Sequence, residues 1–265
     1  CTLPAARPAD CAACAGHAAP ARLARLTAIA RQADLRTAPS RTAAAFCEAS
    51  GTGPVTVWEN GILRPGRGFA DARTGRSGPA VLGYLGGPSA AKGWPVLREA
   101  VRKLGRGDLV FHAVDGGVLA PWWRPGSFDG LPGDWRRIPR FDPAAADDFY
   151  AGIDALVFPS RWRETFGLTV REALARGLRV IRTGPGGQGE HPPAPGVRVY
   201  PYDLPEAEAA EALARAIAAT ADQIASGAPR TLPPLPVRTA GDQADDLLSM
   251  LGSLSGRKGA APAAG

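Results

Sequence analysis

Residues 154–182 read DALVFPSRWRETFGLTVREALARGLRVIR and decide the fold. The run opens with a short apolar stretch that Pro159 ends, and it closes with a second apolar stretch at residues 178–182. Between them, residues 168–176 have the apolar spacing of a helix, and Gly177 is a natural helix C-cap. The run therefore predicts two parallel strands connected by a helix.

The same alternation of short apolar and amphipathic stretches continues on both sides of this run. We expect further strands at residues 80–85, 108–114, 137–141 and 197–200, and further helices at residues 93–104, 143–151 and 205–225. Short apolar strands that alternate with helices are typical of a parallel sheet covered on both faces. The sequence therefore predicts an α/β fold with a doubly wound parallel sheet.

The flanking sequence is expected to form smaller parts. Helices are expected at residues 21–33, 40–47 and 240–254, and a strand at residues 55–58. We expect a partial N-terminal domain at residues 1–64, a Gly/Arg/Pro-rich linker at 65–79, a Rossmann-like domain at 80–230, a C-terminal helical segment at 231–255 and a disordered tail at 256–265.

The composition excludes several classes of protein. Of the 265 residues, 45% are hydrophobic and 21% are charged, which argues against wholesale disorder. No apolar run approaches the ~20 residues of a membrane span, and the first residues lack the apolar core of a signal peptide. The net charge of +6 fits a solvated basic surface, an anionic ligand or an anionic membrane surface. Nucleic acid is not expected as a partner, because the basic residues are scattered without interleaved aromatics.

The cysteines cluster at the start of the chain. Cys11 and Cys14 have the two-residue gap of a zinc knuckle, with Cys1 and His17 as further candidate ligands. A structural zinc site normally needs four ligands, so free thiols in a reducing cytoplasm are the favoured interpretation and a structural metal is the alternative.

Three segments are expected to meet where the parallel strands end, at the edge where such sheets bind ligands. The first is Gly86-Gly87-Pro88-Ser89-Ala90-Ala91-Lys92-Gly93, whose glycines, lysine and following helix N-terminus favour an anion. It is neither a P-loop nor a Gly-x-Gly-x-x-Gly fingerprint. The third is the glycine-rich turn at residues 184–190. Taken alone, each is also compatible with a plain surface turn.

The second segment, residues 159–177, carries the more specific pattern. We expect Glu164 in the loop above a helix N-terminus and Glu172 about a turn and a half into that helix. Between them, the N–H groups of Phe166, Gly167 and Leu168 form a cradle for an anion. Two carboxylates on either side of an anion cradle suit a ligand with hydroxyls at both ends and phosphates in the middle, which describes a nucleotide sugar.

Residues 159–190 resemble the donor-binding signature of retaining family 4 glycosyltransferases of the GT-B fold. The signature is a Glu-x7-Glu motif, here Glu164 and Glu172, followed by a Gly-Gly-x-x-Glu turn, here at residues 186–190. The Lys92-Gly93 pair resembles the phosphate site of the family. The Ala38-Pro39-Ser40 and Asn60-Gly61 segments resemble the end of its N-terminal acceptor domain, so that the resemblance covers roughly residues 33–190.

The resemblance implies roles for these residues. Glu172 would bind the ribose hydroxyls, Glu164 would contact the donor sugar, and Lys92 with the helix amides would hold the diphosphate. Lys92 and Glu164 are the implied catalytic residues, and the implied donor contacts are Gly86, Gly87, Lys92, Glu164, Thr165, Phe166, Gly167, Leu168 and Glu172. Many members carry an arginine shortly before the lysine, where this chain has Gly86 or Gly87. The phosphate charge would then be compensated less strongly, or be compensated by Arg161 or Arg163.

The resemblance also implies a reaction and a place for it. A hexosyl-type transferase would use a UDP- or GDP-sugar donor, a glycan or lipid-linked acceptor and no cofactor, in the synthesis of bacterial cell-surface polysaccharide. The expected location is cytoplasmic, with peripheral contact to the inner membrane as an alternative. A full acceptor domain runs to well over a hundred residues, and about sixty precede the linker here, so we expect a fragment.

Fixed positive groups would stabilise the departing nucleoside diphosphate, so the reaction needs no metal, and no Asp-x-Asp motif lies near the segment. One alternative is a dinucleotide-dependent oxidoreductase. Asp115 at the end of a strand supports it, and the absence of a Gly-x-Gly-x-x-Gly motif opposes it. Another alternative is a non-catalytic, truncated module. Phe141 and Asp142, after an expected strand, are candidates for the border of a nucleobase site.

Overall fold

The computed structural model describes residues 19–66, 69, 73, 75–115 and 128–259 of the chain. The chain forms two compact units, which we describe separately. Among the described residues, the larger unit comprises those between 64 and 236, and the smaller one comprises residues 19–63 together with 237–259. The C-terminal helix therefore groups with the N-terminal residues rather than forming a part of its own.

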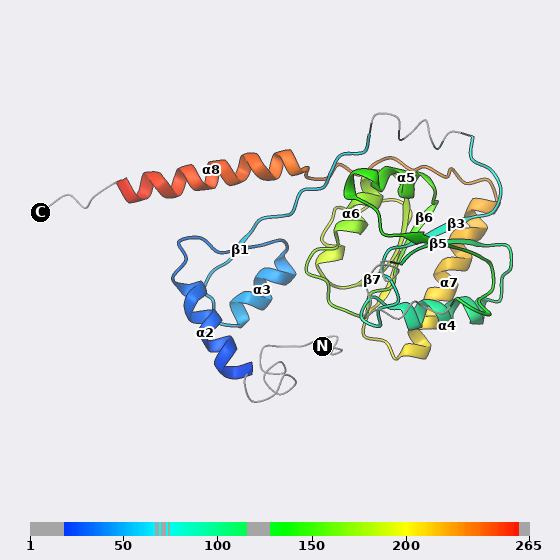
Figure 1. Ribbon diagram of the computed structural model, residues 1–265, viewed down its shortest axis with the longest axis horizontal. Coiled ribbons are helices and arrows are strands. Elements are labelled where there is room, and N and C mark those ends of the chain that lie inside the picture. The colour runs from blue at the N-terminus through cyan, green and yellow to red at the C-terminus, as the bar shows by residue number, and fades with distance from the viewer. Residues whose placement is uncertain (1–18, 67–68, 70–72, 74, 116–127, 260–265) are drawn as a thin grey trace, which may run out of the picture. The chain divides into compact units, whose positions relative to one another are not determined.

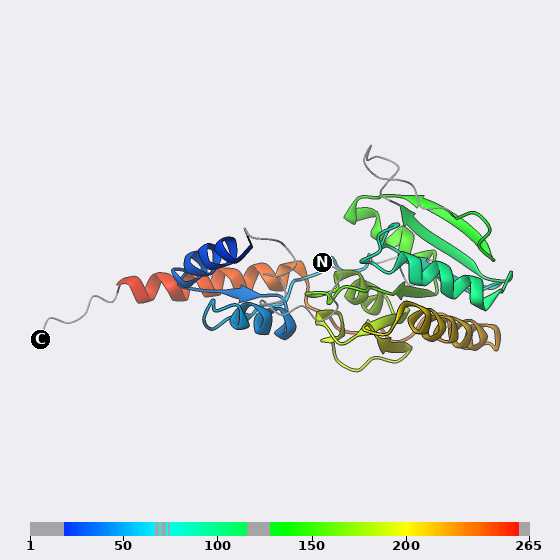
Figure 2. The same ribbon diagram turned by 90° about the horizontal axis from the view of Figure 1, so that it is seen from below.

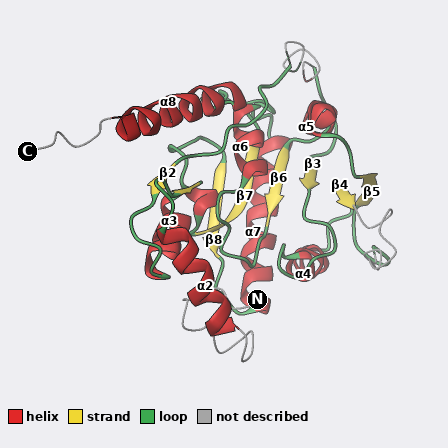
Figure 3. Cartoon of the chain, turned by 60° about the vertical axis from the view of Figure 1, so that its left-hand side comes forward, coloured by secondary structure: helices red, strands yellow, loops and turns green. Residues whose placement is uncertain are grey.

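The larger unit is built on a sheet of six strands in the order β5-β4-β3-β6-β7-β8, and every neighbouring pair is parallel. The strands, yellow in Figure 3, are β3 (Val81–Tyr84), β4 (Val110–Asp115), β5 (Asp134–Pro139), β6 (Ala155–Phe158), β7 (Arg179–Gly184) and β8 (Val197–Pro201). Because parallel strands need crossover connections, this order confirms the expected doubly wound α/β fold.

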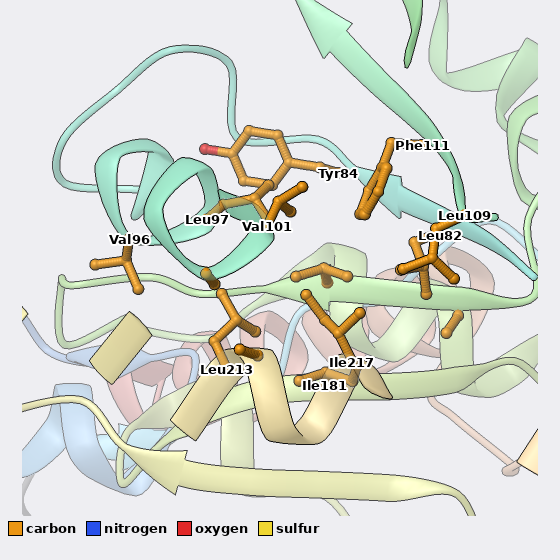
Figure 4. Close-up of a cluster of buried hydrophobic side chains, with 14 of the residues drawn as sticks. Leu82, Tyr84, Val96, Leu97, Val101, Leu109, Phe111, Ile181, Leu213 and Ile217 are labelled. Carbon is orange, nitrogen blue, oxygen red and sulfur yellow. The ribbon is translucent and has the colours of Figure 1, made fainter. Parts of the chain in front are cut away.

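Helices cover both faces of this sheet. They are α4 (Trp94–Leu104), α5 (Ala146–Ala151) after the short η3 (Pro143–Ala145), α6 (Leu168–Ala175) and α7 (Glu206–Ala225). Helices α4 and α7 lie side by side, as Figures 1 and 2 show, and pack with one set of strand side chains. Figure 4 shows this cluster, which includes Leu82, Leu97, Phe111, Leu213 and Ile217. Helices α5 and α6 form the second cluster with the opposite face, through Phe149, Tyr150, Val170 and Leu174.

Strand β6 shows how the sequence produces two covered faces. Ala155 and Val157 belong to the cluster with α4 and α7, whereas Leu156 between them belongs to the cluster with α5 and α6. Successive side chains of a strand point to opposite faces, so the four apolar residues of β6 give both faces of the sheet an apolar side chain. This is why the central strands could be recognised as short apolar runs.

The expected strand at residues 137–141 is wrong in its bounds. The strand is β5, Asp134–Pro139, at the edge of the sheet, and four of its six residues are exposed. Its inner contact comes from Trp135, whose ring stacks on that of Phe111 with 4.2 Å between centroids. An edge strand needs apolar residues only on its covered face, so charged residues at residues 134, 136 and 137 concealed it.

The smaller unit contains α2 (Ala19–Arg31), β1 (Thr37–Ala38), α3 (Arg41–Ala49), β2 (Thr56–Val57) and α8 (Ala240–Gly259). Strands β1 and β2 pair in parallel, and Ser40 caps α3 as expected, because its hydroxyl accepts a hydrogen bond of 3.0 Å from the Ala43 N–H. Helix α8 runs past residue 255, where the helical segment was expected to end. Across the described residues, no helix combines the length and apolar character that crossing a bilayer requires.

The chain leaves and re-enters the smaller unit at one place. Ile62 and Thr239 form a parallel bridge, with the Ile62 N–H donating to the Arg238 carbonyl and the Ala240 N–H donating to the Ile62 carbonyl, both at 3.0 Å. Gly61 lies beneath this crossing, since a Cβ there would stand 2.1 Å from the Thr239 carbonyl oxygen. The two passages of the chain are therefore fixed next to each other.

Candidate functional site

Three loops meet at the carboxyl edge of the sheet: those after β3, β6 and β7. Backbone and hydroxyl hydrogen bonds join them, from the Arg161 N–H to Ala91 O (2.8 Å), from the Thr183 hydroxyl to Ser160 O (2.9 Å) and from the Gly187 N–H to Glu164 O (2.8 Å). The three segments that the sequence singled out are thus in contact with one another.

The loop after β3 is held by Tyr84 and by two glycines. The buried Tyr84 hydroxyl donates to the Gly87 carbonyl oxygen at 2.7 Å, and a Cβ on Gly86 would stand 2.3 Å from that hydroxyl. Gly93 has a φ of 79°, and a Cβ there would stand 1.9 Å from the Pro159 carbonyl oxygen. The absence of a side chain at Gly86 and Gly93 therefore lets this loop pack against Tyr84 and against the loop after β6.

Lys92 and Glu164, predicted separately as catalytic residues, form an ion pair. The Lys92 Nζ lies 2.7 Å from Glu164 Oε1, and the Ser160 hydroxyl donates to the same oxygen at 2.7 Å. The side chain of Glu164 is 11% exposed and that of Lys92 is 43% exposed. The lysine charge therefore faces solvent on one side and a carboxylate on the other, and Glu164 has a fixed position.

The predicted anion cradle lies at the start of α6. Its N-cap is Gly167, which has a φ of 78° and no side-chain hydrogen bond to the helix. The first N–H groups of a helix have no partner within the helix, and they carry the positive end of its dipole. Phe166 is buried, whereas Thr165 and Leu168 are exposed beside this terminus.

Glu172 lies on α6, half-buried, beside α5. The hydroxyl of Tyr150, a residue with no exposed surface, donates to Glu172 Oε2 at 2.6 Å. Burial, followed by the charge of Glu172, raises the pKa of Tyr150 well above its usual value, so the tyrosine stays a donor. One carboxylate oxygen of Glu172 is thereby oriented by the protein.

The glycine turn after β7 packs against the loop that carries Glu164. A Cβ on Gly187 would stand 2.1 Å from the Thr165 carbonyl oxygen, and one on Gly167 would stand 2.5 Å from the Gln188 Cβ. Gln188 is fully buried and donates from Nε2 to the Thr183 carbonyl oxygen at 3.1 Å. Gly187 and Gly167 therefore allow the two loops to pack closely against each other.

Arg171 ties these two loops together, and sequence reasoning missed it. Its buried guanidinium donates to the carbonyl oxygens of Phe166, Gly187 (3.1 Å) and Glu190 (3.0 Å), and it lies 3.5 Å from the centre of the Phe166 ring. The helical spacing could have identified Arg171 as buried. It lies three positions before Leu174 and next to Val170, so it shares the side of α6 that faces the core.

Arg182 adds positive charge beneath the glycine turn. Its side chain is 8% exposed, Nη1 donates to the Thr183 carbonyl oxygen at 3.1 Å, and Nε has no partner among the described residues. Burial lowers the pKa of Arg182. Burial, together with the nearby charges of Arg182 and Arg171, also lowers the pKa of His191.

Arg161 and Arg163 are the two arginines expected to compensate for the missing arginine at Gly86 or Gly87. Arg161 donates to the Leu204 carbonyl oxygen at 2.7 Å, and Arg163 is exposed.

Other residues that the sequence singled out have structural contacts. Asp115 is 1% exposed, with Arg137 Nε 3.5 Å from its carboxylate, so it does not present a carboxylate to a ribose. Phe141 stacks on Phe149, and Asp142 caps η3 by accepting from the Ala144 N–H at 2.8 Å. The candidate zinc ligands lie outside the described residues; they are Cys1, Cys11, Cys14 and His17. Within the described part of the chain, no three His, Cys, Asp or Glu side chains come together as a metal site.

The fold resembles several solved glycosyltransferases at low sequence identity. A sucrose-phosphate synthase from Thermosynechococcus elongatus matches with a TM-score of 0.64 and 20% identity over 91% of this chain and 62% of that chain. Anabaena Alr3699/HepE in complex with UDP and glucose matches with a TM-score of 0.60 and 17% identity, over 88% of this chain and 67% of that one. A trehalose-phosphate synthase from Burkholderia xenovorans, in complex with glucose-6-phosphate, matches with a TM-score of 0.66 and 10% identity, over 94% and 66%.

The chain thus spans between 62% and 67% of these three solved chains. No curated protein sequence matches it closely enough to count as a relative. The family model described as "Glycosyl transferases group 1" matches residues 79–221, which is more than half of the chain and includes all six strands of the larger sheet. The chain therefore belongs to the group 1 glycosyl transferases.

Proposed function

We propose that this chain binds the donor of a retaining, hexosyl-type family 4 glycosyltransferase. The observation that carries the proposal is the arrangement around the start of α6, where an N-terminus without a side-chain cap is followed by Glu172 and preceded by the Lys92–Glu164 ion pair. Helix N-termini favour phosphate, and carboxylates accept hydrogen bonds from sugar hydroxyls. The UDP in the Anabaena HepE structure supports a uridine nucleotide as the first choice, with GDP as the alternative.

In this proposal each group has one task. The amides of Phe166, Gly167 and Leu168 and the ammonium of Lys92 hold the diphosphate, and Glu172 holds the ribose hydroxyls. Glu164 contacts the donor sugar and positions Lys92, while Gly86, Gly87 and Thr165 line the site. Tyr150 orients Glu172 and Arg171 fixes the loops, so both act as positioning residues.

The chemistry follows from where negative charge develops. When the bond between the anomeric carbon and the phosphate oxygen breaks, the electron pair stays on the diphosphate. Lys92 and the α6 N-terminus then face a larger negative charge than in the bound donor, which is the difference that accelerates a reaction. One fixed donor of this kind typically contributes about 3–4 kcal/mol to transition-state stabilisation.

We further propose the setting of this reaction. Residues 80–230 bind the nucleotide sugar, and the acceptor is a glycan or lipid-linked glycan in bacterial cell-surface polysaccharide synthesis. The site would work in the cytoplasm, at the inner membrane where the acceptor is lipid-linked. The chain spans only part of its solved relatives, so nucleotide binding is the direct test for this chain.

The first test removes the charge of Glu172. We expect Glu172→Gln to weaken UDP binding about 10- to 100-fold in titration calorimetry, because hydrogen bonds to a charged group contribute about 1.5–3 kcal/mol. Uridine, which carries the ribose without phosphate, should lose affinity by a similar factor. The exposed Glu208→Gln in α7 is the matched control and should leave both affinities unchanged. An unchanged UDP affinity in Glu172→Gln would refute the role of Glu172.

The second test removes the charge of Lys92. Lys92→Gln should weaken UDP binding by about 10- to 100-fold, for the same charge-assisted contact, but should leave uridine binding unchanged. Lys103→Gln, on the exposed side of α4, is the control. An equal loss for uridine and UDP would contradict a phosphate contact. Binding of NAD in place of UDP and GDP would overturn the whole proposal in favour of a dinucleotide enzyme.

A further inference from the structure

A second polar site lies at the opposite, amino-terminal edge of the sheet. A hollow of about 480 Å³ is formed by the end of α7 and the chain that follows it, together with the segment leading into β3. The strands are four to six residues long, so this edge lies about 13–20 Å from the edge that carries the proposed donor site. The two sites therefore have no residue in common.

Three arginines line this hollow around a single carboxylate. Asp154, which has no exposed surface, lies 2.6 Å from Arg230 Nη1, 3.6 Å from Arg73 Nη2 and 3.8 Å from Arg76 Nε. Arg179 is the first residue of β7 and pairs with Ala155 of β6, the residue after Asp154. Its buried Nη1 has no partner among the described residues. The three lining arginines and Asp154 leave a net of two positive charges, and Arg179 adds to it.

The arginines are held in place by backbone carbonyl groups. Arg73 donates to the carbonyl oxygens of Tyr150, Ile153 and Arg230. These neutral partners orient the guanidinium groups but do not neutralise them. Burial and the nearby charges of Arg76 and Arg230 lower the pKa of Arg73 to about 10, against the opposing effect of Asp154, so Arg73 remains charged at neutral pH.

The two arginines nearest the solvent, Arg76 and Arg230, have N–H groups that donate to no described residue. Arg76 donates to the carbonyl oxygens of Ala151 and Gly152, and Arg230 donates to those of Gly78 and Pro79 and to Asp154. Each guanidinium has five N–H donors, so about half of the ten N–H groups are used within the described residues. Their side chains are 20% and 13% exposed, which leaves the remaining donors within reach of a ligand.

The rim of the hollow is open. Gly75, Gly78 and Gly227 line it, and a Cβ added at any of them would meet no atom within 4 Å. A neighbouring hollow of about 450 Å³ shares Arg76 and Ser77 and adds Arg136 and His112 from the adjacent strands. Volumes of this size are typical of sites for small molecules.

We propose that this hollow binds the phosphate group of a small molecule, independently of the donor site. The phosphate group of a monoester carries a charge of about −1.5 to −2 at neutral pH, which matches the excess charge of the arginines. Guanidinium groups bind phosphate oxygens through pairs of parallel N–H donors, so two or more arginines around one hollow favour phosphate over a singly charged carboxylate. The neighbouring hollow gives the rest of the molecule a place beside Arg76.

The test introduces a carboxylate into the hollow at Ser77, which is exposed and lines both hollows. Inorganic phosphate is titrated into the full chain at constant ionic strength, with binding measured by calorimetry. The wild-type chain should bind phosphate, Ser77→Asp should lose at least tenfold in affinity, and the uncharged Ser77→Asn should retain it. Arg76→Gln should lose at least tenfold as well, by removing a positive charge without adding a carboxylate.

Lys92→Gln separates this hollow from the phosphate cradle of the donor site, and it should leave inorganic phosphate binding here within twofold. The proposal is overturned if the wild-type chain binds no phosphate, if Lys92→Gln removes the binding, or if Ser77→Asp binds phosphate as Ser77→Asn does. Thermal unfolding supplies a second readout, since phosphate should raise the melting temperature of the wild type and of Ser77→Asn, and not that of Ser77→Asp. Equal shifts in the three proteins would also overturn it.

Discussion

Gly187→Ala is expected to lower the free energy of unfolding by about 3 kcal/mol, at the upper end of the cost of overpacking. The added Cβ would stand 2.1 Å from the Thr165 carbonyl oxygen and 2.8 Å from the Phe166 backbone nitrogen. Both contacts are with backbone, so no side chain can rotate away and the two loops must separate. Because the separation moves the start of α6, UDP binding should weaken together with stability.

Denaturant unfolding and UDP titration of the same variant measure these two effects. Gly107→Ala is the matched control, since a Cβ at Gly107 would meet no atom within 4 Å and its effect should stay within about 0.5 kcal/mol. If Gly187→Ala unfolds at the same denaturant concentration as Gly107→Ala, the two loops are not packed as described here.

Arg171→Met is expected to cost about 3–5 kcal/mol of stability. Methionine has a similar length and fills the same space, but it removes this donor from the carbonyl oxygens of Phe166 and Glu190 and leaves that of Gly187 with the Glu190 N–H alone. Each buried polar group that loses its partner costs about 1–3 kcal/mol, and part of the loss is recovered where water reaches Glu190. The loss should be visible in denaturant unfolding.

Arg171→Lys distinguishes the shape of the guanidinium from its charge. Lysine keeps the positive charge but cannot reach three carbonyl groups with a planar fork, so most of the loss should persist. The control is Arg102→Met on the exposed side of α4, which should change stability by about 0.5 kcal/mol or less. Full stability in Arg171→Lys would mean that charge alone, and not the set of hydrogen bonds, connects the loops.

The sequence predicted those parts of the fold that depend on neighbouring residues. The central strands β3 and β6 contain no charged residue, and Gly177, whose φ is +66°, lies two positions past the last residue of α6. Ser40 was recognisable as an N-cap because capping involves residues only three positions apart. Strand β5 was displaced, because an edge strand is defined by its neighbour β4 and not by its own hydrophobicity.

The contacts of the candidate site could be predicted only in part. The Glu-x7-Glu spacing placed both glutamates around the start of one helix, since seven intervening residues are a local feature. The ion pair between Lys92 and Glu164 joins residues 72 positions apart, and the arginines around Asp154 come from positions 73, 76 and 230. Such contacts follow from the order of strands in the sheet, and a single sequence does not encode that order in any local pattern.

The bridge between Ile62 and Thr239 has a consequence for how such a chain can be rearranged. Residues 64–236 depart and return through two adjacent backbone segments, so the six-stranded body is an insertion in the sequence of the smaller unit, with neighbouring ends. Bodies with neighbouring ends tolerate circular permutation and transplantation, because a short linker can close the gap. A body of this kind can therefore be exchanged between relatives by two cuts, while the backbone segments on either side keep their pairing with each other.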